Sequence, residues 1–412
     1  MNVLWITNSP FSEAYKGTRL EENAKGWVNS AAYGLIEYKN ISLGVVSLYP
    51  QKEFNVVEAN RIRHYLLPKK QRNNKSSLKK YWTEIANDFK PDIIHIHGTE
   101  YPFLSAFVEL SDLKKIVVSI QGLVSVIERY YLGGIKKSEL MKSTSLRDII
   151  RVNTIFSQHL DLQKRGNSEK SLLKKVNHVI GRTTWDYCHV KSINPKLSYH
   201  FCNEILRPIF YEKQWDISAC EKYSIFISQA YYPLKGFHQL LKALPQIIKI
   251  FPDTKVYVAG NDFVRNRGFR INGYGRFIKK FIEKNNLKRQ IIFTGLLSND
   301  AIQQRFLNSH VFVNPSSIEN SSNSIGEAQI LGVPCVASYV GGTPDLIKHR
   351  ETGLLYRFEE VEMLAENVCK IFSDEKLASR LSQKSRIVAQ ERHNKEINTK
   401  RLLSIYQNII EN

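Results

Sequence analysis

Short runs of β-branched and aromatic residues alternate with helix-compatible segments along the chain, and the whole series occurs twice. The strand-like runs of the first series are 2–7, 41–48, 92–98, 115–122 and 178–183, and those of the second are 223–229, 254–260, 290–295, 310–316 and 334–338. Strands that alternate with helices build parallel sheets. Because the series starts again in the second half, the sequence predicts an α/β protein with two doubly wound, Rossmann-like domains.

The two series join within a polar segment at residues 203–214. We therefore predict a first domain over 1–205, a second over 206–390, and a closing helix over 391–412 that can cross back to the first domain. A chain of 412 residues supports two domains, since one core seldom organises more than about 300 residues. Ligands of parallel sheets bind at the carboxyl ends of strands, so two such domains that face each other predict a central cleft.

Cysteine usage and hydropathy bear on the cellular compartment. The five cysteines have no paired spacing, which argues against a disulfide framework and a thiolate metal cluster and favours a reducing cytoplasm. The first residues have no basic lead, and no apolar stretch reaches the roughly 18 residues of a membrane span. We expect a cytoplasmic protein that can also lie on the inner face of the membrane.

The net charge of +20 is concentrated in part in residues 61–80, which hold eight Lys or Arg and no acid. A solvated loop is the simplest explanation of such a run, and an anionic membrane surface is the preferred functional one. Nucleic acid is disfavoured, because no zinc-finger spacing, aromatic RNA-binding string or basic heptad accompanies the charge.

Two glutamates, Glu319 and Glu327, are separated by seven intervening residues where a strand-like run leads through a loop into a predicted helix. In this arrangement the first amides of the helix, at Ser322, Asn323, Ser324 and Ile325, can bind an anion or a sugar hydroxyl. Both glutamates would then flank one ligand. For two isolated acids, a favourable interaction with the helix dipole is the competing explanation.

The residues around this pair carry a family resemblance. EAQILGVPCVAS at 327–338 and VGGTPDLI at 340–347 resemble the retaining GT-B nucleotide-sugar glycosyltransferases of the group 1 type. The resemblance implies that Glu319 contacts hydroxyls of the donor sugar and that Glu327 contacts the ribose hydroxyls. A carboxylate suits either task, because it accepts two hydrogen bonds.

The segment YYPLKGFHQLLKAL at 231–244 resembles the Lys-Gly helix entry of the same family. The resemblance implies that Lys235 is the cation against the donor diphosphate, whereas a lone Lys-Gly would otherwise indicate only an exposed loop. The family carries an Arg about five residues earlier, where this chain has Ala230 beside Gln229. Three arginines could replace that charge, or belong to an exposed basic loop: Arg265, Arg267 and Arg270.

The first half of the chain resembles the family more weakly. The glycine-rich loop after the first strand is reduced to Gly17, which the resemblance implies binds phosphate and which equally suits a plain turn. His97, a candidate catalytic residue, and Glu100 lie at the carboxyl end of a buried strand-like run. Gln121 stands where many members have histidine, and Arg182 follows a further run. With Glu100 these two are candidate acceptor or anion contacts, and core or loop roles are the alternatives.

Together these features predict a retaining, hexosyltransferase-like enzyme that needs no metal or cofactor, with a nucleotide sugar as donor and a glycan or lipid-linked acceptor of surface polysaccharide synthesis. No paired acids end a strand and no cluster has metal-ligand spacing. A dehydrogenase is disfavoured, since no GxGxxG follows a strand-like run. A non-catalytic nucleotide-sugar-binding subunit stays an alternative, because Ala230 and Gln121 depart from the family pattern.

Overall fold

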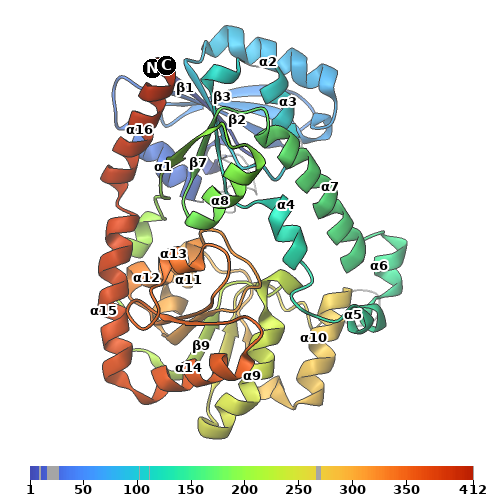
Figure 1. Ribbon diagram of the computed structural model, residues 1–412, viewed down its shortest axis with the longest axis vertical. Helices are drawn as coiled ribbons and strands as arrows, with labels where there is room; N and C mark the ends of the chain where they lie inside the picture. Colours follow the sequence, from blue (N-terminus) through green and yellow to red (C-terminus); the bar gives the residue numbers. More distant parts are fainter. Residues whose placement is uncertain (9–10, 16–26, 102, 111, 266–270, 412) are drawn as a thin grey trace. The chain divides into compact units, whose positions relative to one another are not determined.

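The computed structural model describes residues 1–8, 11–15, 27–101, 103–110, 112–265 and 271–411. Packing contacts divide the chain into two compact units (Figure 1). Unit 1 comprises Met1–Val126, Gln163–Arg207 and His393–Asn412, and unit 2 comprises Ile127–Leu162 and Pro208–Arg392. Each unit is an α/β structure around one sheet, so the predicted fold class is confirmed.

The sheet of unit 1 has the strand order β3-β4-β2-β1-β5-β6-β7-β8, and all described pairs are parallel except the β3–β4 hairpin. Its strands are β1 (Asn2–Ile6), β2 (Ser42–Tyr49), β3 (Asn55–Ala59), β4 (Ile62–Pro68), β5 (Ile93–His97), β6 (Ile116–Ser119), β7 (His178–Gly181) and β8 (Ser198–Phe201). Its helices are α1 (Trp27–Ile36), α2 (Lys75–Phe89), α3 (Phe103–Leu110), α8 (Thr184–Ile193) and α16 (Lys395–Glu411), with parts of α4 (Val124–Ile127) and α7 (Ile155–Leu173).

Alternate side chains of β1 enter the two cores of unit 1, as the twofold period of a strand requires. Leu4 and Ile6 join the core with α2, α3, α7 and α8, while Val3 and Trp5 join the core with α1 and α16. Both faces of the sheet are therefore covered, which explains why its central strands are almost continuously apolar.

The closing helix α16 belongs to the core of unit 1 and packs against α1 and β5. The hydroxyl of Tyr406 accepts a 3.0 Å hydrogen bond from Trp5 Nε1 and lies 2.6 Å from His95 Nδ1. Burial lowers the pKa of His95 to about 3, so its ring is neutral, and its other nitrogen, Nε2, pairs with the hydroxyl of Ser119. This network ties the end of the chain to the middle of the sheet.

The sheet of unit 2 is parallel in the order β11-β10-β9-β12-β13-β14. Its strands are β9 (Glu221–Ile227), β10 (Lys255–Val258), β11 (Ile291–Phe293), β12 (Ser309–Asn314), β13 (Cys335–Ser338) and β14 (Leu354–Tyr356). Its helices are α5 (Lys137–Ser143), α6 (Leu146–Ile150), α9 (Phe237–Ile250), α10 (Gly273–Lys284), α11 (Asn299–Leu307), α12 (Asn323–Leu331), α13 (Thr343–Leu346), α14 (Val361–Ser373) and α15 (Glu375–Arg392).

Residues 127–162, which we call the arm, come from the first half of the chain and pack within unit 2. The carbonyl of Gly133 accepts a 2.7 Å hydrogen bond from His238 Nε2, and Asp148 Oδ2 accepts one of 2.7 Å from the amide of Gly273. Burial lowers the pKa of His238 to about 3, which leaves a neutral ring that donates through Nε2. The predicted limits at 205 and 390 did not separate the arm. They stay predictions, because packing alone does not show which segments fold independently.

The basic segment 61–80 is not one loop. Ile62–Pro68 form β4, and α2 begins at Lys75. Six basic side chains are exposed on the connection and the start of α2: Lys69, Lys70, Arg72, Lys75, Lys79 and Lys80.

Among the described residues, no helix combines the length and hydropathy needed to cross a membrane. All five cysteines are free thiols.

Candidate functional site

The loops after β9 and β12 meet at the carboxyl edge of the sheet of unit 2, because these strands are neighbours in it. A pocket of about 200 Å³ lies between the loops. Its lining residues are Ile227, Ser228, Gln229, Lys235, Val313, Asn314, Pro315, Ser316, Glu319, Ser321, Ser322, Asn323 and Ser324. This edge is where open parallel sheets bind their ligands.

Lys235 and Glu319 lie side by side in this pocket. Lys235 ends a short 3₁₀ turn, Pro233–Lys235, and its Nζ donates a 2.7 Å hydrogen bond to Glu319 Oε1. The hydroxyl of Ser316 donates to the same oxygen at 2.6 Å. Burial of Lys235 opposes its charge, but the Glu319 carboxylate outweighs that effect, and the pKa of Lys235 is raised. The ammonium is therefore cationic at neutral pH.

Gly236 makes the contact between the two loops possible. It has φ +66°, and a Cβ built at this position would lie 1.6 Å from the carbonyl oxygen of Pro315. Only glycine allows this close backbone approach in a left-handed conformation. The neighbouring Lys235 is thereby brought against the loop that carries Glu319.

The amino terminus of α12 supplies further polar groups to the pocket. Asn323 and Ser324 are the first two residues of α12 and line the pocket, and their amides have no partner inside the helix. The side chain of Ser322 accepts a 3.2 Å hydrogen bond from Asn314 Nδ2 and does not cap the helix. The amide of Ile325 donates to the Ser322 carbonyl at 3.1 Å, so it is already engaged. An ammonium, helix amides and serine hydroxyls together suit an anion that carries hydroxyl groups.

Glu327 lies in the second turn of α12 and is only 4% exposed. It is not one of the described residues that line the pocket.

Ala230, where the family carries an arginine, is buried, while Gln229 lines the pocket. Arg265 is exposed and lines a different pocket, and Arg267 and Arg270 lie outside the described residues. Among the described residues, Lys235 is the one cationic side chain in the lining.

The predicted residues of unit 1 also gather at a carboxyl edge. His97 ends β5, Glu100 follows it, and Gln121 and Arg182 follow β6 and β7. A Cβ built on Gly98 would lie 2.2 Å from Glu100 Oε2 and 3.5 Å from Gln121 Cδ, which places these two side chains together. Burial raises the pKa of Glu100 to about 7. Gly17 lies outside the described residues.

Arg182 and His97 are buried, whereas a side chain that contacts an acceptor has to be reachable from solvent. Arg182 Nη1 lies 2.9 Å from Glu204 Oε1, and both side chains are buried, so the guanidinium already has an ionic partner. His97 is buried against the ring of Trp5 at 4.3 Å between ring centroids. Burial holds the pKa of His97 well below its usual range, so its ring is neutral. Of the predicted set, Glu100 and Gln121 are more accessible than His97 and Arg182, and both are partly buried.

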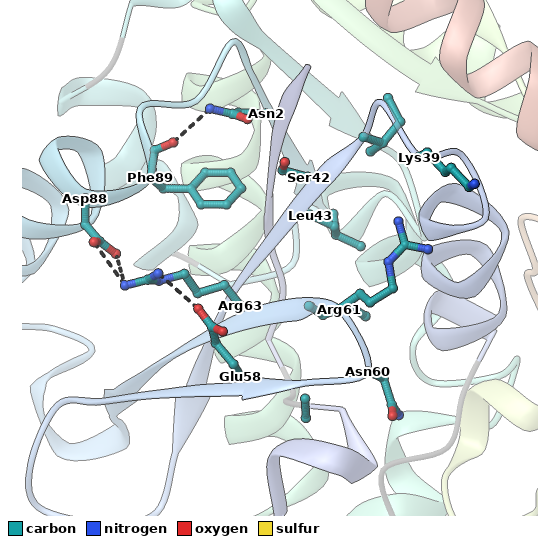
Figure 2. Close-up of a pocket in the computed structure, with 13 residues that line it drawn as sticks. Asn2, Lys39, Ser42, Leu43, Glu58, Asn60, Arg61, Arg63, Asp88 and Phe89 are labelled. Carbon is teal, nitrogen blue, oxygen red and sulfur yellow. Dashed lines mark hydrogen bonds and ion pairs between the residues drawn. The ribbon is translucent and has the colours of Figure 1, made fainter.

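A larger pocket of unit 1, about 600 Å³, lies at the opposite edge of its sheet (Figure 2). Asn2, Ser42 and Ile62, which line it, begin β1, β2 and β4. In the wall of this pocket Arg63 forms two ion pairs: its Nη1 lies 3.0 Å from Glu58 Oε1, and its Nη2 lies 2.9 Å from Asp88 Oδ2. Because ligands of such sheets bind at the other edge, size alone does not make this pocket the functional site.

Ser316 was missed by the sequence analysis, although it donates to Glu319. Its position in NPSS, directly after β12, was the available signal, because side chains after a parallel strand line the binding edge. No group of three or more potential metal ligands occurs among the described residues. The expectation of a metal-free site stays a prediction.

The two units define a GT-B type fold, and solved structures support this. The chain is similar over its full length to the sucrose-phosphate synthase of Thermosynechococcus elongatus, with TM-score 0.74, 17% identity and coverage of 100% of this chain and 99% of that one. It is also similar to HepE of Anabaena, solved with UDP and glucose, with TM-score 0.63, 13% identity and coverage of 99% and 100%.

Sequence comparison matches much of the second half of the chain to a family. Residues 210–388 match the family described as Glycosyl transferases group 1. An uncharacterized glycosyltransferase of Methanocaldococcus jannaschii is 22% identical over 256 residues, which is 56% of this chain and 63% of that protein. The matches to the next two curated relatives span about half of their length, 48% and 46%.

Proposed function

We propose that the protein is a retaining, metal-independent glycosyltransferase that binds a nucleotide diphosphate sugar in the pocket of unit 2. The observation that carries this proposal is the Lys235–Glu319 pair at the amino terminus of α12. Lys235 is suited to the diphosphate because an ammonium has three donors and only one is used by Glu319. The family match and the Anabaena structure solved with UDP and glucose support a nucleotide sugar as donor.

In the proposed reaction, the bond between sugar C1 and the diphosphate oxygen breaks while Lys235 and the α12 amides stabilise the charge on the leaving group. The acceptor oxygen bonds to C1 from the same face, so the anomeric configuration is retained. The acceptor proton passes to an oxygen of the departing diphosphate. No cofactor and no nucleophile from the protein are needed.

We further propose that the acceptor is a glycan or lipid-linked hydroxyl compound of surface polysaccharide synthesis, bound beside Glu100 and Gln121. The protein then works at the cytoplasmic face of the membrane. The exposed basic residues from Lys69 to Lys80 support this location, because each adds about 1 kcal/mol of attraction to an anionic surface.

The proposal is tested by offering the purified protein a panel of nucleotide sugars and measuring release of nucleotide diphosphate with and without a candidate acceptor. Nuclear magnetic resonance of the product gives its anomeric configuration. We expect retention and activity that persists in EDTA. An inverted product contradicts the retaining mechanism. Full inhibition by EDTA, reversed by Mg²⁺ or Mn²⁺, contradicts metal independence.

The alternative is a non-catalytic subunit that only binds the nucleotide sugar. It is favoured by Ala230, which leaves the pocket without the second cation that the resemblance implies. Calorimetry separates the two functions. Donor binding without hydrolysis or transfer, for every donor that binds, supports the subunit.

Replacing the two glutamates by glutamine is expected to separate turnover from donor binding. Glu319→Gln should lower kcat by about 10- to 100-fold with little change in donor Kd, because its contact to the reacting sugar strengthens as the ring gains positive charge. Glu327→Gln should raise the donor Kd by about tenfold and leave kcat unchanged, because a contact to the ribose has the same strength in the ground state and in the transition state.

Donor Kd by calorimetry, kcat and melting temperature should be measured for both variants. Glu327 is buried within α12, so the melting temperature is an essential control. If both changes lower only the melting temperature, the glutamates stabilise the start of the helix and the donor must bind elsewhere.

A further inference from the structure

The arm of unit 2 carries an unusual concentration of exposed apolar side chains. Ile150 and Val152 are each 77% exposed, Met141 is 65% exposed and Ile149 is 57% exposed. We call these four residues the arm tip. Three of them fall within four consecutive residues at the end of α6, and Met141 lies on the preceding helix α5. Single exposed apolar residues are common, but such a concentration indicates an interaction surface.

Basic residues flank the arm tip in the sequence. Residues 136–152 contain five basic residues and two acids, and one of these acids, Asp148, is buried. The exposed basic side chains, which we call the basic border, are Lys136, Lys137, Lys142 and Arg151. Apolar side chains with a basic border match the two layers of an anionic membrane surface, in which acyl chains lie beneath negatively charged headgroups.

The backbone of the arm tip is suited to a poorly hydrated environment. The amides of Arg151, Val152 and Asn153 donate to the carbonyls of Arg147, Ile149 and Asp148 at 2.9, 3.1 and 2.8 Å. Few of these backbone groups therefore lose a water partner when the turn enters an interface. Asp148 also fixes the turn to α10 through the amide of Gly273. Figure 1 shows α5 and α6 beside α10.

Val152 adopts φ +49°. The left-handed region is unfavourable for a β-branched residue, and Asn or Asp would be tolerated better there. An exposed valine in this conformation therefore does not improve the fold of the turn. An apolar side chain at this position is explained if it is buried in an environment that the free protein lacks.

From these observations we propose that the arm tip inserts into the interfacial layer of an anionic lipid bilayer and docks unit 2 on the membrane. Ile149, Ile150, Val152 and Met141 enter the acyl boundary, and the basic border contacts the headgroups. This surface is distinct from the basic segment of unit 1. The inference does not rest on the proposed transfer activity, because membrane binding is measured without donor or acceptor.

The test compares Ile150→Asp/Val152→Asp with the matched pair Ile387→Asp/Val388→Asp, which replaces exposed side chains of the same types on α15. Flotation with vesicles of phosphatidylcholine and phosphatidylglycerol gives the partition coefficient. The arm-tip variant should lose about tenfold or more in partitioning, the effect of removing one to two buried apolar side chains. The α15 variant should bind as the wild type does.

Salt separates the arm tip from the basic segment. At about 1 M salt, charge attraction is screened, so the binding that remains should depend on the arm tip. Lys79→Ala/Lys80→Ala should weaken binding at about 0.1 M salt and change little at high salt. Asp at position 152 suits the left-handed backbone, so unchanged melting temperatures are expected and confirm that the variants fold.

Three results would overturn the proposal. The first is equal loss of binding in the arm-tip and α15 variants, and the second is equal binding of the wild type to anionic and to pure phosphatidylcholine vesicles. The third is a wild-type dimer, detected by light scattering without vesicles, that the arm-tip substitutions dissociate while vesicle binding is unchanged. That outcome would assign the arm tip to a second copy of the chain.

Discussion

Lys235→Ala is expected to lower kcat/KM by about 10²- to 10³-fold, the size of effect seen when one preorganised donor to a developing anion is removed. The physical reason is that the diphosphate must leave as a polyanion from a pocket whose described lining has no second cationic side chain. The loss should fall mainly on kcat, because charge on the leaving oxygen grows in the transition state.

The same substitution also leaves Glu319 without its ammonium partner, so stability must be measured separately. The Glu319 side chain is 12% exposed and keeps the hydrogen bond from Ser316, so we expect a loss of about 1 to 3 kcal/mol in the free energy of unfolding. Lys235→Ala/Glu319→Gln removes the unpaired charge. It should recover most of that stability and recover no activity.

Lys242→Ala is a suitable control for Lys235→Ala, because Lys242 lies on α9, the helix that follows the Lys235 turn, and donates to Gln239 outside the pocket lining. It should retain kcat/KM within about threefold, a change of less than 1 kcal/mol. Urea denaturation and steady-state kinetics on all three variants complete the test. Near-wild-type turnover by Lys235→Ala would remove this residue from the donor site.

The parallel strands could be predicted because their pattern is local. In the run NVLWI, successive side chains point to opposite faces of the sheet. The four residues PLKG form the turn that precedes α9 and indicate where this helix begins. Lys235 and Glu319 were identified as partners of one ligand through the family resemblance. Their mutual hydrogen bond joins residues 84 positions apart, and no spacing rule predicts a contact of that separation.

The arm and the β3–β4 hairpin were missed for different reasons. The arm has ordinary helix signals, and its assignment to unit 2 rests on long-range contacts such as Gly133 with His238. The hairpin turns through Asn60 and Arg61, both at positive φ, and the second position lacks the glycine that usually marks such a turn. Glu327 was paired with Glu319 by its position at the helix start and by resemblance, whereas its burial in α12 depends on packing that the sequence does not display.

Gly236→Ala is expected to abolish most activity without touching any group that contacts the donor. The new Cβ would lie 1.6 Å from the Pro315 carbonyl oxygen, so either the Lys235 turn or the β12 loop must move. We expect kcat/KM to fall by about 10²-fold, because a shift near 1 Å in a positioning contact has effects of that size. The free energy of unfolding should fall by about 2 to 4 kcal/mol through backbone strain and overpacking.

Gly295→Ala provides the matched control, because Gly295 has φ +75° and a Cβ there would meet nothing within 4 Å. Gly295→Ala should lose about 1 to 2 kcal/mol in the free energy of unfolding, because alanine is unfavourable in the left-handed region, but its Cβ collides with no other atom. The difference between the two variants therefore measures the close approach of the loops that carry Lys235 and Glu319. If both variants lose equal stability and both keep kcat/KM, the loops tolerate separation and the Lys235–Glu319 contact is not what organises the donor site.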